Sequence, residues 1–137
     1  MSYASRLREN YSLTYEIEPE VLAANIEALN DCAQACTSDA GDDLNEPSVN
    51  EMVRCIGLCM DCADICTATV RIISRQTKDD VKVTERLLEA CIGVCKACGD
   101  ECERHAQMHQ HCLVCAQVCR RCERACQELL EAIRRST

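Results

Sequence analysis

Cysteine recurs along this chain at intervals of three and four residues, and this spacing constrains the fold more than any other feature. The chain has 137 residues, of which 15 are cysteine. Intervals of 4-3-4 place side chains on one stripe of an α-helix, where a helical bundle normally buries leucine. The pattern therefore predicts helices that turn rows of thiols toward a shared core. The positions are Cys32, Cys36, Cys55, Cys59, Cys62, Cys66, Cys91, Cys95, Cys98, Cys102, Cys112, Cys115, Cys119, Cys122 and Cys126.

The composition indicates an all-α fold of one domain. There are three Tyr, no Phe, no Trp, four Gly and two Pro, which leaves too few turn formers for a β protein. We predict an up-down-up-down antiparallel four-helix bundle with a Cys-lined core over residues 18–137. Residues 1–17 are expected to form a short N-terminal extension that packs on the outside of the bundle or against a neighbouring subunit.

Local signals predict the ends of the first two helices. The first is expected to begin near Pro19, which suits a first helical turn, and to fade by Gly41, with a loop over 42–47. The second is expected to open with the S-x-x-E capping box that starts at Ser48 and to end near Arg75.

The second half of the chain needs a reversal that the sequence marks weakly. A third helix is predicted from residues 79–80, but no Gly or Pro lies between Glu101 and Cys126. One helix over 79–134 would be about 80 Å long, which is incompatible with a compact domain. We therefore predict a tight reversal at 104–107 and a fourth helix over 108–134.

The net charge and the N-terminal sequence limit which binding partners and which cellular compartment we expect. The net charge of -8 disfavours nucleic acid and anionic membrane surfaces and chiefly indicates solubility. Neither a secretory h-region nor a membrane-span length of apolar residues is present, so we expect a cytoplasmic protein whose thiols stay reduced. Cysteines four apart on a helix have Cβ atoms about 5–6 Å apart, too far for a comfortable disulfide. Metal binding is the expected use of these thiols.

The two ends of the predicted bundle differ in chemistry. The end that holds the 1–2 loop and the 3–4 turn collects potential soft-metal ligands, which we call the mouth: Met52, His105, Met108, His109 and His111. The other end collects an apolar plug: Leu22, Ile73, Leu88, Leu129 and Ile133. The mouth residues are candidate metal ligands for uptake, although the methionines also suit an ordinary core and the histidines a solvated turn. Asp61 is a further candidate, expected on a flank of its helix.

Spacing alone does not name the metal, because C-x-x-C pairs also occur in zinc and iron–sulfur proteins. Closed zinc sites need four defined ligands, and the first helix is expected to have too few cysteines to complete them. Cu(I) is soft, selects thiolates and thioethers, and accepts two or three ligands, so neighbouring thiols can share ions. The softness and low coordination number of the ion thus favour Cu(I), at a load of about one ion per thiolate.

The chain resembles the cytosolic copper storage proteins, the Cys-rich four-helix-bundle Csp family. The resemblance rests on the C-x-x-x-C pairs on all four helices and on the His105-x-x-x-His109-x-His111 run before Cys112. It implies multiple Cu(I) ions inside the bundle, bound by Cys with a few His and Met at the mouth, and a homotetramer. Five cysteines in the final helix, including Cys112-x-x-Cys115, depart from the family's pattern near the mouth.

The function predicted from these residues is cytosolic storage and detoxification of Cu(I), with no enzymatic activity. The partners expected are copper ions and a cytosolic copper chaperone. The alternative is an iron–sulfur or zinc-binding Cys-rich bundle with an electron-transfer or buffering role.

Overall fold

Four long α-helices make up nearly all of residues 6, 17–75 and 81–136, the part of the chain that the computed structural model describes. The helices are α2 (Pro19–Leu44), α3 (Val53–Arg75), α4 (Val81–His105) and α5 (Gln110–Ser136), and the short 3-10 helix η1 (Val49–Glu51) precedes α3. Among these residues there is no β-strand. The predicted all-α fold is confirmed.

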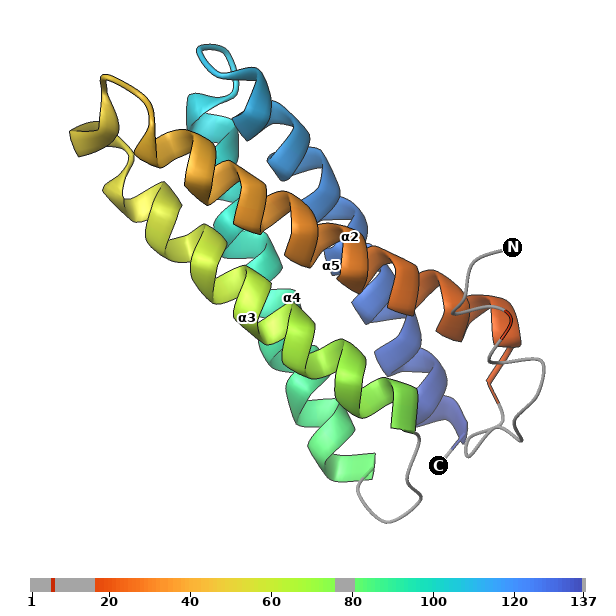
Figure 1. Ribbon diagram of the computed structural model, residues 1–137. Coiled ribbons are helices and arrows are strands. Elements are labelled where there is room, and N and C mark those ends of the chain that lie inside the picture. Colours follow the sequence, from red (N-terminus) through yellow and green to blue (C-terminus); the bar gives the residue numbers. More distant parts are fainter. Residues whose placement is uncertain (1–5, 7–16, 76–80, 137) are drawn as a thin grey trace.

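The helices form an antiparallel bundle in which each one packs against two neighbours. Helix α2 contacts α3 and α5, and α4 contacts the same two helices from the opposite corner. The connections α2–α3 and α4–α5 lie at one end of the bundle, as predicted, and the C-terminal end of α5 lies at the other (Figure 1). No helix within the described ranges has the length and apolar character needed to cross a membrane.

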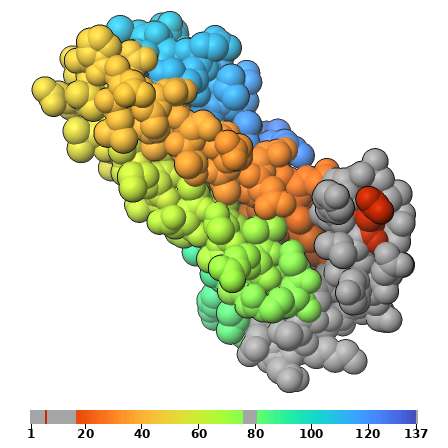
Figure 2. All heavy atoms as spheres, in the orientation of Figure 1, coloured from red at the N-terminus to blue at the C-terminus, as the bar shows by residue number. Residues whose placement is uncertain are grey.

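The bundle encloses the thiols along its axis and apolar side chains at one end. All 15 cysteines are buried, and we call this column of sulfur the thiol tube. Helices α2 and α3 pack closely side by side over it (Figure 2). The five residues of the predicted plug are also buried, each 4% exposed or less. The interior is therefore sulfur from the mouth to the middle and hydrocarbon at the far end.

Helix α2 begins as predicted but ends later than predicted. Pro19 occupies its first turn beside Glu20, whereas the helix continues through Gly41 to Leu44. The prediction that it fades by Gly41 was wrong because a single glycine costs an α-helix only about 1 kcal/mol. Buried contacts of the Asp39 and Asp43 side chains at the mouth stabilise this extra turn.

The capping box does not open the second helix. Ser48 makes no side-chain hydrogen bond to the helix and instead precedes η1, while α3 starts at Val53. The η1 turn carries Met52 into the core, where it is 1% exposed. Tertiary burial of Met52 has thus overridden the local capping signal. The predicted end of this helix at Arg75 is confirmed.

The reversal between α4 and α5 lies two residues beyond its predicted place. Helix α4 ends at His105 and α5 begins at Gln110, so the turn occupies 106–109. Backbone N–H groups of Met108 and His109 both donate to the carbonyl of His105, at 3.1 and 3.0 Å. The prediction that the last helix begins at 108 was wrong, because Met108 lies in this turn and is 79% exposed.

Two predictions fall largely outside the described residues. Residues 1–17, the predicted N-terminal extension, are described only at Arg6 and Ile17, and the Ile17 side chain is buried in the core. The predicted start of the third helix at 79–80 also lies outside them; α4 is described from Val81.

Candidate metal centre

Thirteen of the 15 thiols form one continuous column, while Cys112 contacts the carboxylates of the mouth and Cys126 contacts Asn25. Sγ atoms from neighbouring helices lie 3.6–4.0 Å apart, as in Cys59–Cys98 at 3.6 Å and Cys66–Cys91 at 3.7 Å. The i, i+4 pairs on one helix are as close, with Cys62 and Cys66 at 3.9 Å. A disulfide needs about 2.05 Å, and every cysteine is free. The column is therefore a set of reduced sulfur ligands.

Several sets of four ligand atoms lie within 4.8 Å of one another and could each surround an ion. One set takes a thiol from each of the four helices: Cys32, Cys66, Cys95 and Cys122. The first helix provides only two thiols, Cys32 and Cys36, and each of them belongs to two of the sets. The other sets of four thiols are Cys32, Cys36, Cys62, Cys119; Cys36, Cys98, Cys115, Cys119; and Cys59, Cys98, Cys102, Cys115.

These sets share their members, and this sharing limits the chemistry. Cys32 and Cys119 each belong to two of the sets, as do Cys36 and Cys98. A closed tetrahedral zinc site uses four ligands of its own, so the sets cannot all be filled with zinc at once. Two- and three-coordinate Cu(I) ions bridged by shared thiolates can fill the whole column.

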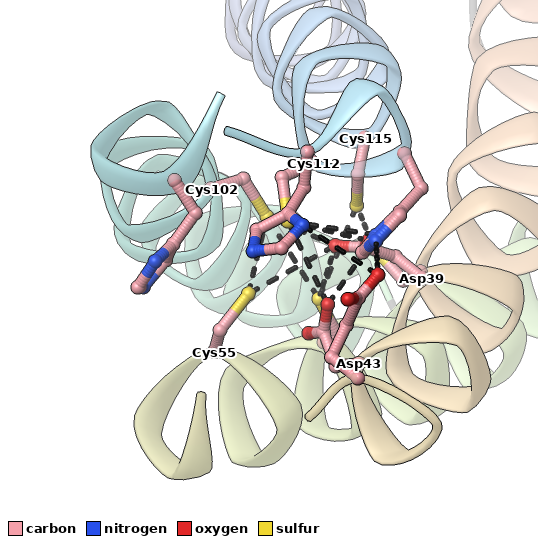
Figure 3. Close-up of polar contacts among 12 residues, drawn as sticks. Asp39, Asp43, Cys55, Cys102, Cys112 and Cys115 are labelled. Atoms are coloured by element: carbon pink, nitrogen blue, oxygen red, sulfur yellow. Dashed lines mark hydrogen bonds and ion pairs between the residues drawn. The ribbon is translucent and has the colours of Figure 1, made fainter. Parts of the chain in front are cut away.

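Two buried aspartates that the sequence analysis did not select stand at the mouth. Asp39 and Asp43 come from the last turns of α2 and are 2% and 0% exposed. Asp39 Oδ2 lies 3.4 Å from Cys59 Sγ and 3.5 Å from Cys102 Sγ, so this carboxylate faces directly into the tube (Figure 3). The signal was present: from Cys32 and Cys36, the 3-4 spacing continues to residues 39 and 43.

The three histidines gather at the mouth, and each contacts a carboxylate. His111 Nδ1 is 2.5 Å from Asp39 Oδ1, and its Nε2 is 3.1 Å from Glu46 Oε1. His105 Nε2 is 3.0 Å from Oε2 of Glu101, an acid that is 4% exposed. The rings of His109 and His111 lie 5.2 Å apart between their centroids. The predicted clustering of histidines is thus present, with carboxylates that the sequence analysis missed.

The remaining candidate ligands are placed differently from one another. Met52 is buried beside the tube, whereas Met108 is 79% exposed in the α4–α5 turn. Asp61 is exposed on the outer face of α3, the flank expected for it. At the inner end of the tube, Asn25 Nδ2 donates to Cys126 Sγ at 3.4 Å.

Burial and hydrogen bonds shift the pKa values of the ionisable side chains at the mouth. It raises the pKa of the Cys112 thiol, and it raises the pKa of Asp43 to about 8 and that of Asp39 above its ordinary value. Burial acts to lower the pKa of His111, but hydrogen bonds to Asp39 and Glu46 outweigh it and raise the pKa overall. These groups therefore hold their protons in the apoprotein, and binding a metal to them releases those protons.

The fold and the site together define a metal-binding four-helix bundle whose interior is lined by thiols. A family model described as Csp, copper storage protein, matches residues 18–131. The chain therefore belongs to the copper storage protein family. None of the curated proteins compared with the chain matches it.

Solved structures agree with this assignment. The chain is 50% identical to the copper storage protein Ccsp of Streptomyces lividans, solved loaded with 10 copper equivalents, with a TM-score of 0.91 over 94% of this chain and 98% of that one. A structure of copper loading to a cytosolic copper storage protein from the same organism, with five coppers, is 56% identical and has a TM-score of 0.80. That match covers 82% of this chain and 93% of the other.

Proposed function

We propose that this chain stores and detoxifies Cu(I) by holding many ions per chain in the thiol tube. The observation that carries the proposal is the column of buried, reduced cysteines, 13 of which have another Sγ atom 3.6–4.0 Å away, with contacts across all four helices. Thiolates at this separation can bridge neighbouring Cu(I) ions, so one column serves many ions. The S. lividans relative loaded with 10 copper equivalents supports a large load.

The alternative metals are not favoured. An iron–sulfur cluster needs an isolated set of four thiolates, whereas the sets here merge into one another. Zinc would leave most of the column unused for the same reason. A storage role needs no substrate pocket beside the metal, and we propose that the protein is not an enzyme.

The mouth is the proposed route for copper. His105, His109 and His111, with Met52 in the core and Met108 at the surface, would pass the ion to Cys36, Cys55, Cys102 and Cys112 at the top of the tube. Imidazole and thioether hold Cu(I) more weakly than thiolate does, so transfer inward is favourable. Asp61 lies on the outside of α3, which argues against a part in this route.

The cellular setting is proposed by analogy with the relatives. The S. lividans protein solved with five coppers is described as cytosolic, and we propose the cytoplasm for this chain. Delivery of copper by a cytosolic chaperone and assembly into a homotetramer remain part of the proposal. Analytical ultracentrifugation of the apoprotein tests the tetramer.

An anaerobic Cu(I) titration of the reduced apoprotein tests the function directly. We expect saturation near one ion per thiolate, about 15 per chain, in competition with a Cu(I)-specific chelator and with excess Zn²⁺ present. About one proton should be released for each thiolate that binds. Saturation at four or fewer Cu(I) ions per chain, or a brown protein as purified, would exclude the storage function.

A further inference from the structure

Four different ligand atoms meet at the mouth, just above the thiol tube. They are Asp39 Oδ1 and Asp43 Oδ1 from α2, and His111 Nδ1 and Cys112 Sγ from the first turn of α5. Cys112 Sγ lies 3.6 Å from each of the other three atoms. His111 Nδ1 lies 3.3 Å from Asp43 Oδ1 and 2.5 Å from Asp39 Oδ1. Figure 3 shows Asp39, Asp43 and Cys112 converging on one space.

These separations are close to the edges of a tetrahedron around zinc. With metal bonds of about 2.0–2.1 Å to N and O and about 2.3 Å to S, an O···N edge is about 3.3 Å and an edge to sulfur about 3.5 Å. Four of the five measured separations agree with these edges. Only the Asp39–His111 contact is short, and it would widen by about 0.8 Å once the ion replaced the shared proton.

A second feature shows that the cluster is incomplete without a cation. Asp43 is 0% exposed, yet its Oδ2 atom has no hydrogen-bond partner among the described residues. A buried carboxyl oxygen without a partner destabilises the folded chain. A cation bound through Asp43 Oδ1 would neutralise this buried carboxylate and lie close enough to attract Oδ2 as well.

We propose that Asp39, Asp43, His111 and Cys112 form a site for a divalent cation of borderline softness, Zn²⁺, at the entrance to the thiol tube, from which it takes only Cys112. Two carboxylates are poor ligands for soft Cu(I) but suit Zn²⁺, and imidazole with one thiolate completes a common zinc donor set. His111 also has the outer partner such a ligand needs, because Nε2 donates to Glu46 Oε1 at 3.1 Å and leaves Nδ1 for the metal.

Charge favours the mouth over the tube for the first zinc ion. Two carboxylates, one thiolate and a neutral imidazole around Zn²⁺ carry a net charge of -1. Four thiolates around Zn²⁺ carry -2, and that charge would lie in a core in which all the cysteines are 0–1% exposed. Burying the larger charge costs more. His111, whose side chain is 20% exposed, also leaves the mouth site open to the solvent.

Zinc in this position would block the entry of copper into the tube. This consequence rests on the proposed copper function, whereas the zinc site itself does not. Because the ion would hold Cys112 and bridge α2 to α5, protein preloaded with one equivalent of Zn²⁺ should take up Cu(I) more slowly. The final capacity should be unchanged once Cu(I), which binds thiolates more tightly, has displaced the zinc.

Titration of the reduced apoprotein with Co²⁺, a coloured substitute for Zn²⁺, tests the site under anaerobic conditions. The first equivalent should give tetrahedral d–d bands with the charge-transfer intensity of one thiolate. Asp43→Asn should weaken this binding at least about tenfold. Asp64→Asn, at an exposed position of α3, is the matched control and should bind like the wild type.

Two measurements keep the test decisive. If Asp43→Asn fails to fold by circular dichroism, His111→Ala takes its place. Zinc-edge anomalous scattering from crystals with one equivalent of Zn²⁺ should place the ion between α2 and α5 at the mouth. A first Co²⁺ equivalent with the intensity of several thiolates, or an anomalous peak within the tube, would overturn the proposal. Copper capacity is measured in a separate titration, so the zinc site and the copper storage function can each be disproved without the other.

Discussion

At the scale of single residues, the informative positions are those where the buried stripe of a helix carries aspartate instead of cysteine. Asp39 and Asp43 occupy the places on α2 where the spacing calls for two more cysteines, and both are buried. A soft column therefore ends in hard oxygen ligands. The sequence predicted the column because cysteines in 3-4 register have few other uses. It did not predict the aspartates, because acids in a terminal turn are normally solvated.

The raised pKa of Asp43 makes the stability of the apoprotein depend on pH. Burial raises this pKa to about 8 from an ordinary value of 3.8. Between these values the folded state holds a proton that the unfolded chain has released, so the free energy of unfolding falls as pH rises, with a slope approaching about 1.4 kcal/mol per pH unit. Asp43→Asn should lose less stability between pH 5 and pH 7, measured by urea unfolding with reductant. Parallel curves for the two proteins would contradict this.

The histidines of the mouth should control the rate of copper movement rather than its amount. Replacing His105, His109 and His111 together with alanine should slow both uptake and removal of Cu(I), and leave the final capacity nearly intact because the cysteines hold most of the ions. Stopped-flow mixing measures both rates, and Gln107→Ala, at an exposed position of the same turn, is the control. Unchanged rates in both directions would mean that the histidines are only turn residues.

At the scale of the helices, the interiors could be predicted from the sequence better than the ends. The stripe of each helix and the start of α2 at Pro19 follow from periodicity and from the stereochemistry of proline. The errors at Gly41 and Ser48 have one cause, since buried contacts at the mouth outweigh local signals worth about 1 kcal/mol. The α4–α5 turn has no glycine or proline, and only the length of the combined helix indicated that it exists.

Two glycines on α4 allow a matched test of helix packing. A Cβ added at Gly93 meets nothing within 4 Å, so Gly93→Ala should raise the free energy of unfolding by about 0.5–1 kcal/mol. A Cβ at Gly99 would lie 3.0 Å from Nη1 of Arg120, whose guanidinium pairs with Asp100 and Glu103 across α4 and α5. Gly99→Ala should therefore gain less. Equal gains in urea unfolding would show that Arg120 moves at no cost.

At the scale of the whole molecule, the bundle should fold without metal. Leu29, Met52, Leu88, Leu129 and Ile133 are each 1% exposed or less and pack the core independently of any ion. We expect the reduced apoprotein, with a chelator present, to give a fully helical far-UV circular dichroism spectrum. Copper should then raise the melting temperature, because the assembled thiol tube binds it more tightly than the separated thiols of the unfolded chain do. A coil spectrum that becomes helical only on addition of Cu(I) would contradict this.

The apolar plug gives the molecule one closed end, and a column with one closed end imposes an order on its contents. On the proposed route through the mouth, each ion advances by exchange between sulfurs 3.6–4.0 Å apart, and ions enter and leave at the same end. The protein would then work as a stack, in which the ions taken up last lie nearest the mouth and are returned first. The ions nearest the plug would be released last and exchange slowly, while those nearest the mouth would be released first and exchange rapidly.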